Sequence, residues 1–486
     1  MTKIKYDKLA IAANVLIFIL MVSCIGDQEE FNYKNAAKQA EEGWKEVPEI
    51  LSRIKPPKFP DRTFNILDFG AVGDSATNSL PAVIKAIEAC NKAGGGKVLV
   101  PAGQYFLDGP IHFQNDVNLH LEQGARIFFS SVPERYLPAV KVRWEGTVCY
   151  NYSPLIYAFQ KMNIAITGDG EIDGAAQEWS AKWRKVQKPD QKQLRQMGND
   201  TIPVNQRVFA NGFLDLNGDG MDDGFGDGKD HYLRPTLIEF YQSENILIEG
   251  LTIRNGPFWT IHPVFSKNVT IRNCKVYGDV LNDDGIDPDS CEDVLIEECM
   301  IKTHDDAISI KAGRDQDAWN RQGTKNVVIR NNQLLSKVNA LCIGSEMSGG
   351  VSNIFMENNK ISNGEHALNF KCNLDRGGQV QNIYIRNIEV ESCRDAMFIF
   401  RMDYHGYRGN NFPTKFNDFY VSNITCNRVE KTPFKIVGVE DEPITRILMK
   451  DVNINSAGEE SIIQNAEDLI FKDVTIGQQE YRYDPK

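Results

Sequence analysis

One short motif returns along most of this chain at a nearly regular interval. Each copy is a polar residue, usually Asn, followed by three or four mostly apolar residues in a β-like alternation, as in Asn245-Ile-Leu-Ile and Asn268-Val-Thr-Ile. From Asn245 onward, successive copies start 23, 25, 33, 27 and 29 residues apart. The copies begin at Asn118, Asn163, Asn245, Asn268, Asp293, Asn326, Asn353, Asn382 and Asn423.

A fixed period of this length indicates a solenoid in which each repeat forms one coil. Short β-like runs without helices between them indicate that the coils form a parallel β-helix. A β-sandwich also has evenly spaced strands, but it would not place the same Asn turn at the same phase nine times. We therefore predict an all-β fold, a single right-handed parallel β-helix, in which periods above 25 mark coils with longer loops.

A helix is expected to cap the N-terminal end of this solenoid. Asn78-Ser-Leu-Pro81 has a capping residue and an early Pro, which favour a helix start. Gly94 to Gly96 ends the helix, and strands follow from Lys97. No Lys-Ser/Thr pair with a helix follows these glycines, so they do not indicate a phosphate-binding loop.

The first 60 residues have the composition of a targeting segment and a linker. A basic start with Lys3, Lys5 and Lys8 precedes an apolar run too short for an ordinary membrane span. The run ends in Met21-Val-Ser-Cys24, which resembles a bacterial lipobox, and the acidic residues after it resemble the export signal of surface lipoproteins in the Bacteroidetes.

We therefore predict a lipoprotein signal peptide at residues 1–23 and a lipid anchor at Cys24. A linker or stalk is expected at 24–60, with a short helix near Ala36–Trp44, and the β-helix is expected at 61–486. The expected location is the outer membrane of a Gram-negative, Bacteroidetes-like bacterium, exposed at the surface, with membrane contact only through the anchor. A plain cleaved secretory signal is the alternative, and it also takes the protein out of the cytoplasm.

Charge and cysteine content exclude some classes of function. The formal net charge of −12 argues against a general nucleic-acid binder. Any anionic substrate must therefore meet local cations. Removing Cys24 from the ten Cys leaves an odd number without tight pairwise spacing, which is not a disulfide framework. Six lie in or beside apolar strand segments and are expected to be buried packing residues: Cys274, Cys299, Cys342, Cys372, Cys393 and Cys426.

An insertion at residues 175–235 interrupts the repeats. Its first half, Gln177–Met197, is expected to be helical. Its second half places oxygen side chains at alternating positions and resembles a calcium loop of the thrombospondin or dockerin kind, with a solvated acidic turn as the alternative. No bidentate Glu follows in this loop. The predicted ligands of a structural Ca²⁺ are Asp215, Asn217, Asp219 and Asp223.

The candidate catalytic residues lie in two short runs of Asp residues. Asp284 and the pair Asp305-Asp306 are 21 residues apart, so they would lie on neighbouring coils. Adjacent strands are separated by about 4.8 Å, and crowded carboxylates hold a proton to higher pH than a free Asp does. That arrangement suits acid–base hydrolysis of an acetal. The alternatives are a solvated acidic turn and a metal site.

The following coils add Ser345-Glu346 and Asn369-Phe370-Lys371 to the same face. With these motifs in place, the sequence resembles glycoside hydrolase family 28, the polygalacturonases, from Thr63 to the C-terminus. The family's Asn-Thr-Asp, Asp-Asp and Arg-Ile-Lys blocks correspond to Asn282-Asp283-Asp284, Asp305-Asp306 and Asn369-Phe370-Lys371. Segments resembling its exo-acting bacterial members are Arg143–Gly146, Asn151–Pro154 and Pro257–Pro263.

The chain departs from the family pattern at two blocks. The Gly-His-Gly block is Gly344-Ser345-Glu346 here, which resembles the bacterial exo-type branch. The Arg of Arg-Ile-Lys is Asn369, which removes a guanidinium able to bind a uronate carboxylate bidentately. The second departure favours considering decorated pectin, such as rhamnogalacturonan, as a substrate.

The resemblance implies a pectin lyase-like solenoid and inverting hydrolysis that needs no cofactor. Asp305 would be the general acid, and Asp284 with Asp306 would hold and deprotonate the attacking water, with carboxyl groups roughly 6.5–9.5 Å apart. Lys371 is the first candidate for the substrate carboxylate, with a solvated loop Lys as the alternative. Lys311 and Arg376 are further candidates, which could instead neutralise the acidic cluster. His262 is another, with a packing role as the alternative. The remaining substrate-binding candidates are Ser345, Glu346, Asn369 and Asn282.

The predicted function is hydrolysis of galacturonosidic linkages in pectin, with exo action by a monomer acting on poly- or oligosaccharide. The insertion at 175–235 and the segment 403–411 could close one end of the groove. Other readings are a hydrolase of rhamnogalacturonan, a pectate lyase, which uses Ca²⁺ and an Arg or Lys base, and a glycan-binding solenoid without catalysis.

Overall fold

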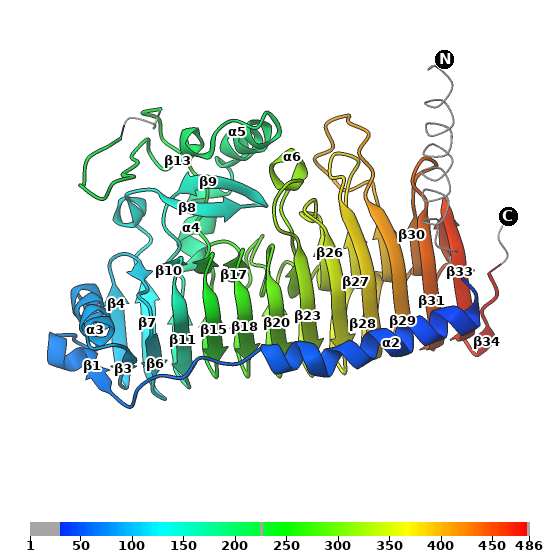
Figure 1. The fold of residues 1–486 in the computed structure, drawn as a ribbon, viewed down its shortest axis with the longest axis horizontal. Helices are drawn as coiled ribbons and strands as arrows, with labels where there is room; N and C mark the ends of the chain where they lie inside the picture. The colour runs from blue at the N-terminus through cyan, green and yellow to red at the C-terminus, as the bar shows by residue number, and fades with distance from the viewer. Residues whose placement is uncertain (1–29, 224–226, 484–486) are drawn as a thin grey trace, which may run out of the picture.

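The computed structural model of the chain describes residues 30–223 and 227–483, and these form one elongated β-helix (Figure 1). The predicted signal peptide and the anchor Cys24 lie outside the described residues. Within the solenoid, consecutive strands lie on different sides of the coil and pair in parallel with their counterparts on the neighbouring coils. The predicted right-handed parallel β-helix is confirmed.

Three parallel ladders build the sides of the solenoid. The first ladder contains β1 (Thr63–Asn65), β3 (Gly96–Val100), β6 (Val117–Leu121), β11 (Met162–Gly168), β15 (Glu244–Glu249), β18 (Lys267–Arg272), β20 (Glu292–Glu297), β23 (Thr324–Arg330), β26 (Val351–Glu357), β28 (Gln379–Arg401), β29 (Lys415–Val429), β31 (Ile444–Ile454) and β33 (Ala466–Ile476). The short β34 (Gln479–Glu480) pairs antiparallel with β33.

The second ladder contains β2 (Asp74–Asn78), β4 (Gly103–Leu107), β7 (Ala125–Phe129), β12 (Glu171–Asp173), β16 (Thr252–Arg254), β19 (Lys275–Tyr277), β21 (Met300–Thr303), β24 (Gln333–Ser336) and β27 (Lys360–Lys371). The third contains β5 (Ile111–His112), β10 (Ile156–Phe159), β14 (Ile238–Tyr241), β17 (Ile261–Val264), β22 (Ile308–Ile310), β25 (Asn339–Gly344), the later halves of β27 and β28, β30 (Thr432–Val437) and β32 (Ile462–Gln464).

The recurring Asn residues turn the chain where each coil enters the first ladder. Asn245, Asn268 and Asn326, for example, have φ of 57°, 54° and 58°, a left-handed conformation that Asn tolerates better than most residues. Their side chains also bond from coil to coil, as where Asn268 Nδ2 donates to Asn245 Oδ1 over 2.6 Å. The motif therefore marks real turns of the solenoid.

Two of the nine motif copies do not belong to this Asn ladder. Asn118 lies inside β6, and Asp116, with φ of 62°, occupies the turn position two residues earlier. Asn423 belongs to a second ladder, in which its Nδ2 donates to Asn387 Oδ1 over 2.6 Å. Both ladders recur once per coil, so either one alone gives the observed period.

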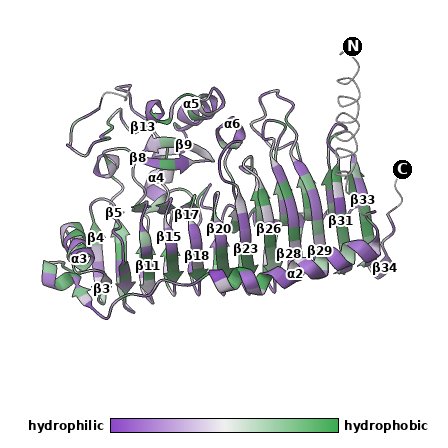
Figure 2. Cartoon of the chain, in the orientation of Figure 1, coloured by the Kyte–Doolittle hydropathy of each residue, from purple (hydrophilic) through white to green (hydrophobic). Residues whose placement is uncertain are grey.

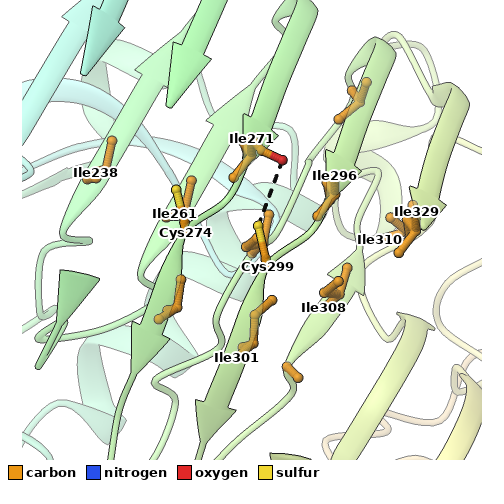
Figure 3. Packing of buried hydrophobic residues seen from close by; sticks show 14 of the residues in the cluster. Ile238, Ile261, Ile271, Cys274, Ile296, Cys299, Ile301, Ile308, Ile310 and Ile329 are labelled. Carbon is orange, nitrogen blue, oxygen red and sulfur yellow. Dashed lines mark hydrogen bonds between the residues drawn. The ribbon is translucent and has the colours of Figure 1, made fainter. Parts of the chain in front are cut away.

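Apolar side chains from the three ladders fill the interior. Figure 3 shows isoleucines of successive coils stacked on one another, with Cys274 and Cys299 packed among them. All nine Cys of the described residues are free and buried, which confirms the six packing cysteines predicted from sequence. Buried and half-buried residues alternate along β3, β6 and β7, whereas β14, β17, β22 and β25 are buried throughout. Figure 2 shows hydrophobic and hydrophilic bands along the strands of the solenoid.

The linker predicted at residues 24–60 is corrected by the structure. Instead of a stalk with a short helix, it contains the 21-residue α2 (Tyr33–Arg53), capped where Asn32 Oδ1 accepts a hydrogen bond from the Asn35 amide over 3.1 Å. The helix lies along the outside of the first ladder from β20 to β31 (Figure 1). It covers an outward-facing apolar row made of Leu295, Val328, Phe355, Tyr384, Tyr420 and Leu448.

The N-terminal end of the solenoid is covered as predicted. Helix α3 (Leu80–Lys92) packs on β1, β3 and the 3₁₀ turn η1 (Ile66–Phe69), with Val83 and Ile87 buried. Its cap comes from Asn78, whose Oδ1 accepts a hydrogen bond from the Leu80 amide. Among the described residues, no helix combines the length and the apolar character that crossing a bilayer requires.

The insertion at 175–235 forms a separate layer on the solenoid. The helical segment expected at Gln177–Met197 is two helices, α4 (Ala176–Trp183) and α5 (Lys188–Asn199). They lie beside a small sheet at the top of Figure 1, with α2 at the bottom. That sheet and its neighbouring turns comprise β8 (Val140–Trp144), β9 (Thr147–Asn151), β13 (Val208–Phe209), η2 (Pro133–Tyr136), η3 (Val204–Gln206) and α6 (Asp315–Ala318).

Candidate active site

The coil brings Asp284, Asp305 and Asp306 together. Backbone bonds join their two coils directly, since the Gly285 amide donates to the Asp306 carbonyl over 2.9 Å. One carboxylate oxygen of each residue lies within 4.8 Å of one oxygen of each of the others. All three residues line a pocket of about 430 Å³ between the solenoid and the insertion.

The three carboxylates have different surroundings. Burial, followed by the charges of Asp287 and Asp305, raises the pKa of Asp284 well above its ordinary value. Burial and the neighbouring Asp306 also raise the pKa of Asp305. Asp305 is half-buried, whereas Asp284 and Asp306 are 3% and 1% exposed.

Asp306 is the carboxylate that stays ionised. Burial alone would raise the pKa of Asp306, but Lys371 and Lys311 together lower it. Lys371 Nζ donates to Asp306 Oδ2 over 2.8 Å, and Asn339 Nδ2 donates to the other oxygen. The cluster therefore separates into one fixed anion, Asp306, and two groups that hold protons more readily.

Two predicted substrate-binding lysines line the pocket but already have partners. Lys371 is paired with Asp306, and its ammonium lies 5.1 Å from the centre of the Tyr404 ring. Lys311 Nζ lies 3.5 Å from Asp284 Oδ2 and 3.4 Å from Glu346 Oε2, and 4.5 Å from the centre of the Trp259 ring. Both ammonium groups hold the acidic cluster in place.

The predicted Ser345 and Glu346 also line the pocket. Ser345 Oγ donates to Glu346 Oε1 over 2.9 Å, and Arg314 pairs with the same oxygen. Burial opposes ionisation of Glu346, yet Arg314 and Lys311 lower its pKa well below the ordinary value. Glu346 is thus a second fixed anion on the pocket wall.

Asn282, also predicted, lines the pocket with φ of 64°. Its amide donates to Asp305 Oδ2 over 3.2 Å, and its Oδ1 accepts from the buried Arg234 over 2.8 Å. Arg234 also donates to Gln187 in the insertion over 3.0 Å. Asn282 therefore links the general-acid candidate to the insertion.

Three predicted substrate-binding residues do not line this pocket. Asn369 is 2% exposed, and its Nδ2 donates to Asn339 over 2.7 Å. Arg376 is 1% exposed and donates to Asp315 over 2.7 Å and to the Ser345 carbonyl over 2.7 Å. His262 is fully buried between Glu239 and Asp289, which raise its pKa to about 9 against the opposing effect of burial. These three side chains are therefore buried next to the pocket and contact protein groups, not the open space of the pocket.

The insertion and the segment 403–411 were expected to enclose the groove and Trp259 was a candidate for its wall, but most individual wall residues were not predicted from the sequence. The described wall also contains Glu145, Arg184, Gln187, Lys188, Gln191, Arg195, Leu281, Arg314, Tyr404 and His405, with Trp259. The sequence of the insertion could have indicated some of them, because polar residues recur there every three or four positions, the spacing of one helix face. These residues are Arg184, Gln187, Gln191 and Arg195. Glu145 lies in the Arg143–Gly146 segment that carried the family resemblance.

Glu145 joins the insertion to the solenoid. Gln191 Nε2 donates to both its oxygens over 2.8 Å, and Arg195 pairs with it over 2.6 Å. Arg314 lies 3.9 Å away on the solenoid side. These contacts fix helix α5 as one wall of the pocket, while Tyr404 and His405 add a second wall from the segment 403–411.

The acidic loop predicted to bind calcium is not gathered around a common point. Asp215 accepts hydrogen bonds from the Gly218 and Gly220 amides over 2.6 and 2.8 Å, and Asp219 accepts from Met221 over 2.8 Å. Within residues 30–223 and 227–483, the acidic side chains that meet in a group of three are those of Asp284, Asp305 and Asp306. Calcium binding by this loop would require rearrangement and stays a prediction.

The spacing of the three carboxylates allows one water molecule to contact two of them. Two oxygens up to 4.8 Å apart can both accept hydrogen bonds from one water, because each such bond is about 2.8 Å long. The expected gap of roughly 6.5–9.5 Å refers to the separation of whole carboxyl groups and not of their nearest oxygens, so it stays a prediction. The cluster can therefore hold a nucleophilic water between two carboxylates while the third donates a proton.

Comparison with known proteins gives two family matches. A family model described as Glycosyl hydrolases family 28 matches residues 186–475. A second, described as Rhamnogalacturonase A/epimerase, pectate lyase-like, matches residues 63–121, the first coils of the solenoid.

Individual proteins show the same similarity. The structure of an exopolygalacturonase from Thermotoga maritima is 36% identical, covers 88% of this chain and 96% of that one, and superposes with a TM-score of 0.79. A probable polygalacturonase from Vitis vinifera is 28% identical over 81% of this chain and 74% of its own length. An exo-poly-alpha-D-galacturonosidase from Dickeya chrysanthemi is 29% identical over 75% of this chain and 62% of its own length.

Proposed function

The chain belongs to glycosyl hydrolases family 28, and from this membership we propose that it is a glycosidase that cleaves galacturonosidic linkages in pectin from the chain end. The observation that carries the proposal is the cluster of Asp284, Asp305 and Asp306 at the pocket, with oxygens within 4.8 Å and unequal pKa shifts. Relatives named as exopolygalacturonase and exo-poly-alpha-D-galacturonosidase support the substrate and the exo mode.

The surroundings of the three carboxylates support a division of labour. Asp305, half-buried with a raised pKa, protonates the oxygen of the leaving sugar as the glycosidic C–O bond breaks. Asp306, held ionised by Lys371, positions the water together with Asp284. The water oxygen bonds to the anomeric carbon, its proton passes to this pair, and the product anomer is inverted, as is characteristic of the family.

The order of proton transfers follows from the coupling within the cluster. The charge of Asp305 raises the pKa of Asp284, and the charge of Asp306 raises that of Asp305, so the cluster favours keeping a proton on one of these carboxyl groups. With that proton on Asp305, Asp284 is an anion next to Lys311, 3.5 Å away, and can accept the proton of the water. The resting cluster thus holds one acid and one base.

The pocket walls support exo action. Helix α5 and the residues Tyr404 and His405 enclose the space next to the carboxylates. Walls on these sides favour a chain end over an internal segment that must pass through. A substrate with several sugars on both sides of the cleaved bond would need the groove to be open in both directions.

The test is product analysis on short uronate chains. Protein lacking residues 1–24 is incubated with oligogalacturonates, and the proposal expects release of monomers or other short end products with inverted anomeric configuration, read by NMR. The Asp305→Asn variant should lose about 100-fold or more in kcat while still binding substrate. Random internal cleavage, or unchanged activity of the variant, would contradict the proposal.

Rhamnogalacturonan is the second candidate substrate. One observation in its favour is Asn369, which occupies the position of an Arg in the family pattern. A second is the match of residues 63–121 to a family model whose description names rhamnogalacturonase. A lyase is less well supported, because the cations at the cluster, Lys311 and Lys371, are both paired with carboxylates. Incubation with rhamnogalacturonan, and ultraviolet absorbance for an unsaturated product, separate these candidates from the first.

We propose in addition that the protein is exported as an outer-membrane lipoprotein and acts as a monomer. The sequence Met21-Val-Ser-Cys24 after an apolar run supports the anchor. Membrane fractionation of cells expressing the full chain should find it with the membranes, and Cys24→Ala should release it. Light scattering of the soluble form should give the mass of one chain.

A further inference from the structure

The charge of the pocket is opposite in sign to that of the molecule. The chain carries a formal net charge of −12. The pocket, in contrast, is lined by six Lys and Arg side chains against five carboxylates. A local surplus of cations in an acidic protein requires a reason, since the field of the whole molecule would not attract an anionic ligand there.

Most of these cations are already neutralised. Lys371 pairs with Asp306, Lys311 with Asp284 and Glu346, Arg195 with Glu145, and Arg314 with Glu346. These ion pairs are within the protein and leave little charge for a substrate. The other two cations of the wall are Arg184, at the end of α4, and Lys188, at the start of α5.

Arg184 and Lys188 have no carboxylate partner and no side-chain hydrogen bond among the described residues. Arg184 is half-buried, and its Nε is out of contact with solvent without an acceptor. Leaving such a group without a partner costs free energy, and a partner that arrives with the ligand removes that cost. Nearby Arg234, whose pKa is lowered by burial and then by the charge of Arg184, adds to the local positive potential.

The position of the two cations is fixed by the rest of the insertion. Gln187 between them receives a hydrogen bond from Arg234, which in turn holds Asn282 beside Asp305. Helix α5 is held by the contacts of Gln191 and Arg195 with Glu145. Arg184 and Lys188 therefore line the same pocket as the catalytic carboxylates, on a segment whose neighbouring residues are held to the solenoid.

We propose that Arg184 and Lys188 form the site that binds the carboxylate of a uronate sugar in the substrate. Arg184 supplies the directional hydrogen bonds of its planar guanidinium, and Lys188, which is exposed, supplies a second charge at the rim. This inference rests on the proposed function. It assigns to the insertion the charge recognition that Asn369, located behind the wall, cannot supply.

The test compares charge-removing variants on the insertion. Arg184→Gln and the double change Arg184→Gln with Lys188→Gln are measured on trigalacturonate and on its methyl ester. The matched control is Lys185→Gln, because Lys185 is exposed, next in sequence to Arg184, and does not line the pocket. Arg184→Lys tests whether charge alone restores binding.

The expected result is a KM for trigalacturonate at least about tenfold higher in Arg184→Gln, and higher again in the double variant, since a hydrogen bond to a charged group is lost. The preference of kcat/KM for the acid over its methyl ester should fall by a similar factor, and its salt dependence should weaken. Lys185→Gln should match the wild type. A purely structural role for Arg184 would not change the preference for acid over ester.

An unchanged preference for acid over ester in the double variant, with KM within twofold of Lys185→Gln, would overturn the inference. If the wild type binds trigalacturonate without cleaving it, the proposed function fails, and calorimetric Kd values of the same variants decide the inference separately. Circular dichroism of each variant checks that α4 and α5 remain folded. A tenfold weaker Kd in Arg184→Gln but not in Lys185→Gln would uphold it.

Discussion

Replacing Lys371 with Met should show whether this residue mainly holds Asp306 or mainly binds substrate. Its ammonium lies 2.8 Å from Asp306 Oδ2, and the two side chains are 5% and 1% exposed. At this distance the attraction is about 6 kcal/mol for an effective dielectric constant near 20. Desolvation of both ions offsets part of it, and breaking a buried pair typically destabilises by about 3–5 kcal/mol.

A double-mutant cycle isolates this interaction. Lys371→Met, Asp306→Asn and their combination are unfolded in urea at pH 7, and we expect a coupling free energy of about 3 kcal/mol. Lys371 lowers the pKa of Asp306, so the coupling is fully present above the ordinary Asp pKa of about 3.9 and is lost as the pH falls from there through the lowered pKa. The cycle of Lys360→Met with Glu389→Gln is the control, because that pair is also close, at 3.0 Å, but both side chains are 65% exposed.

The kinetic counterpart distinguishes the two roles of Lys371. Without the ammonium, the pKa of Asp306 rises, and the acid limb of the pH profile of kcat should move to higher pH. A residue that only binds the substrate carboxylate would raise KM and leave the acid limb in place. A coupling below about 0.5 kcal/mol together with an unmoved acid limb would refute the reasoning, since exposed pairs reach that value too.

Three further predictions concern other parts of the chain. Asp287 is fully buried, neither of its oxygens has a hydrogen-bond partner within the described part of the chain, and burial raises its pKa to about 8. Between about pH 4 and 8 the folded state therefore binds a proton that the unfolded state has released, so the free energy of unfolding should fall as the pH rises. Asp287→Asn should flatten this decline in urea titrations. A Cβ on Gly43 would overlap the Tyr384 ring, so Gly43→Ala should destabilise by about 1–3 kcal/mol without changing kcat, whereas a stable variant would contradict the close packing of α2. If the loop at Asp215–Asp223 binds calcium, millimolar Ca²⁺ should raise the thermal midpoint relative to EDTA and Asp219→Ala should abolish the difference; equal midpoints would refute the site.

The fold and the cluster of three carboxylates could be predicted from the sequence because both depend on the coil period. An Asn that enters each coil in the left-handed region leaves a visible mark, and residues one period apart must lie on adjacent coils. Asp284, Asp305 and Asp306 therefore met as expected. The prediction needed no information about loops.

The supporting residues could not be predicted in the same way. His262 and Arg376 have the residue types of ligand-binding groups, but in the structure they form buried contacts with Asp289 and Asp315. Sequence alone does not distinguish a charge that faces a pocket from one that faces a buried partner. The contacts of Glu145 with Gln191 and Arg314 span 46 and 169 residues, beyond any local pattern.

Helix α2 is longer than the short helix predicted near Ala36–Trp44, because Pro48 lies inside it and a Pro usually disfavours a helix interior. Ala36, Gly43, Val47 and Ile50 are its buried positions; they lie on one helix face, but two of them are small residues. The surface they cover consists of single outward-facing residues on successive strands, such as Phe355 and Tyr384, which look like ordinary alternation in each strand. The match between the two appears only after the coils are stacked.

The placement of α2 has a consequence for the order of folding. A solenoid whose coils contact only their neighbours can nucleate anywhere and can fray from either end. Gln39 on α2, however, accepts hydrogen bonds from Tyr420 and from Arg446, 407 residues further along the chain. Helix α2 is synthesised long before these strands and must therefore wait for segments made near the end of translation, so its docking is expected to be a late step with a high loop-closure cost.

Once docked, α2 turns a row of separable coils into one cooperative unit. It contacts β20, β26, β28, β29 and β31 at once, so none of these coils can open without also losing the helix. Hydrogen exchange should then show similar protection across these strands, in place of a gradient toward the C-terminal end. A segment that lies far from the carboxylates thereby sets how long the C-terminal half stays intact against unfolding and proteolysis.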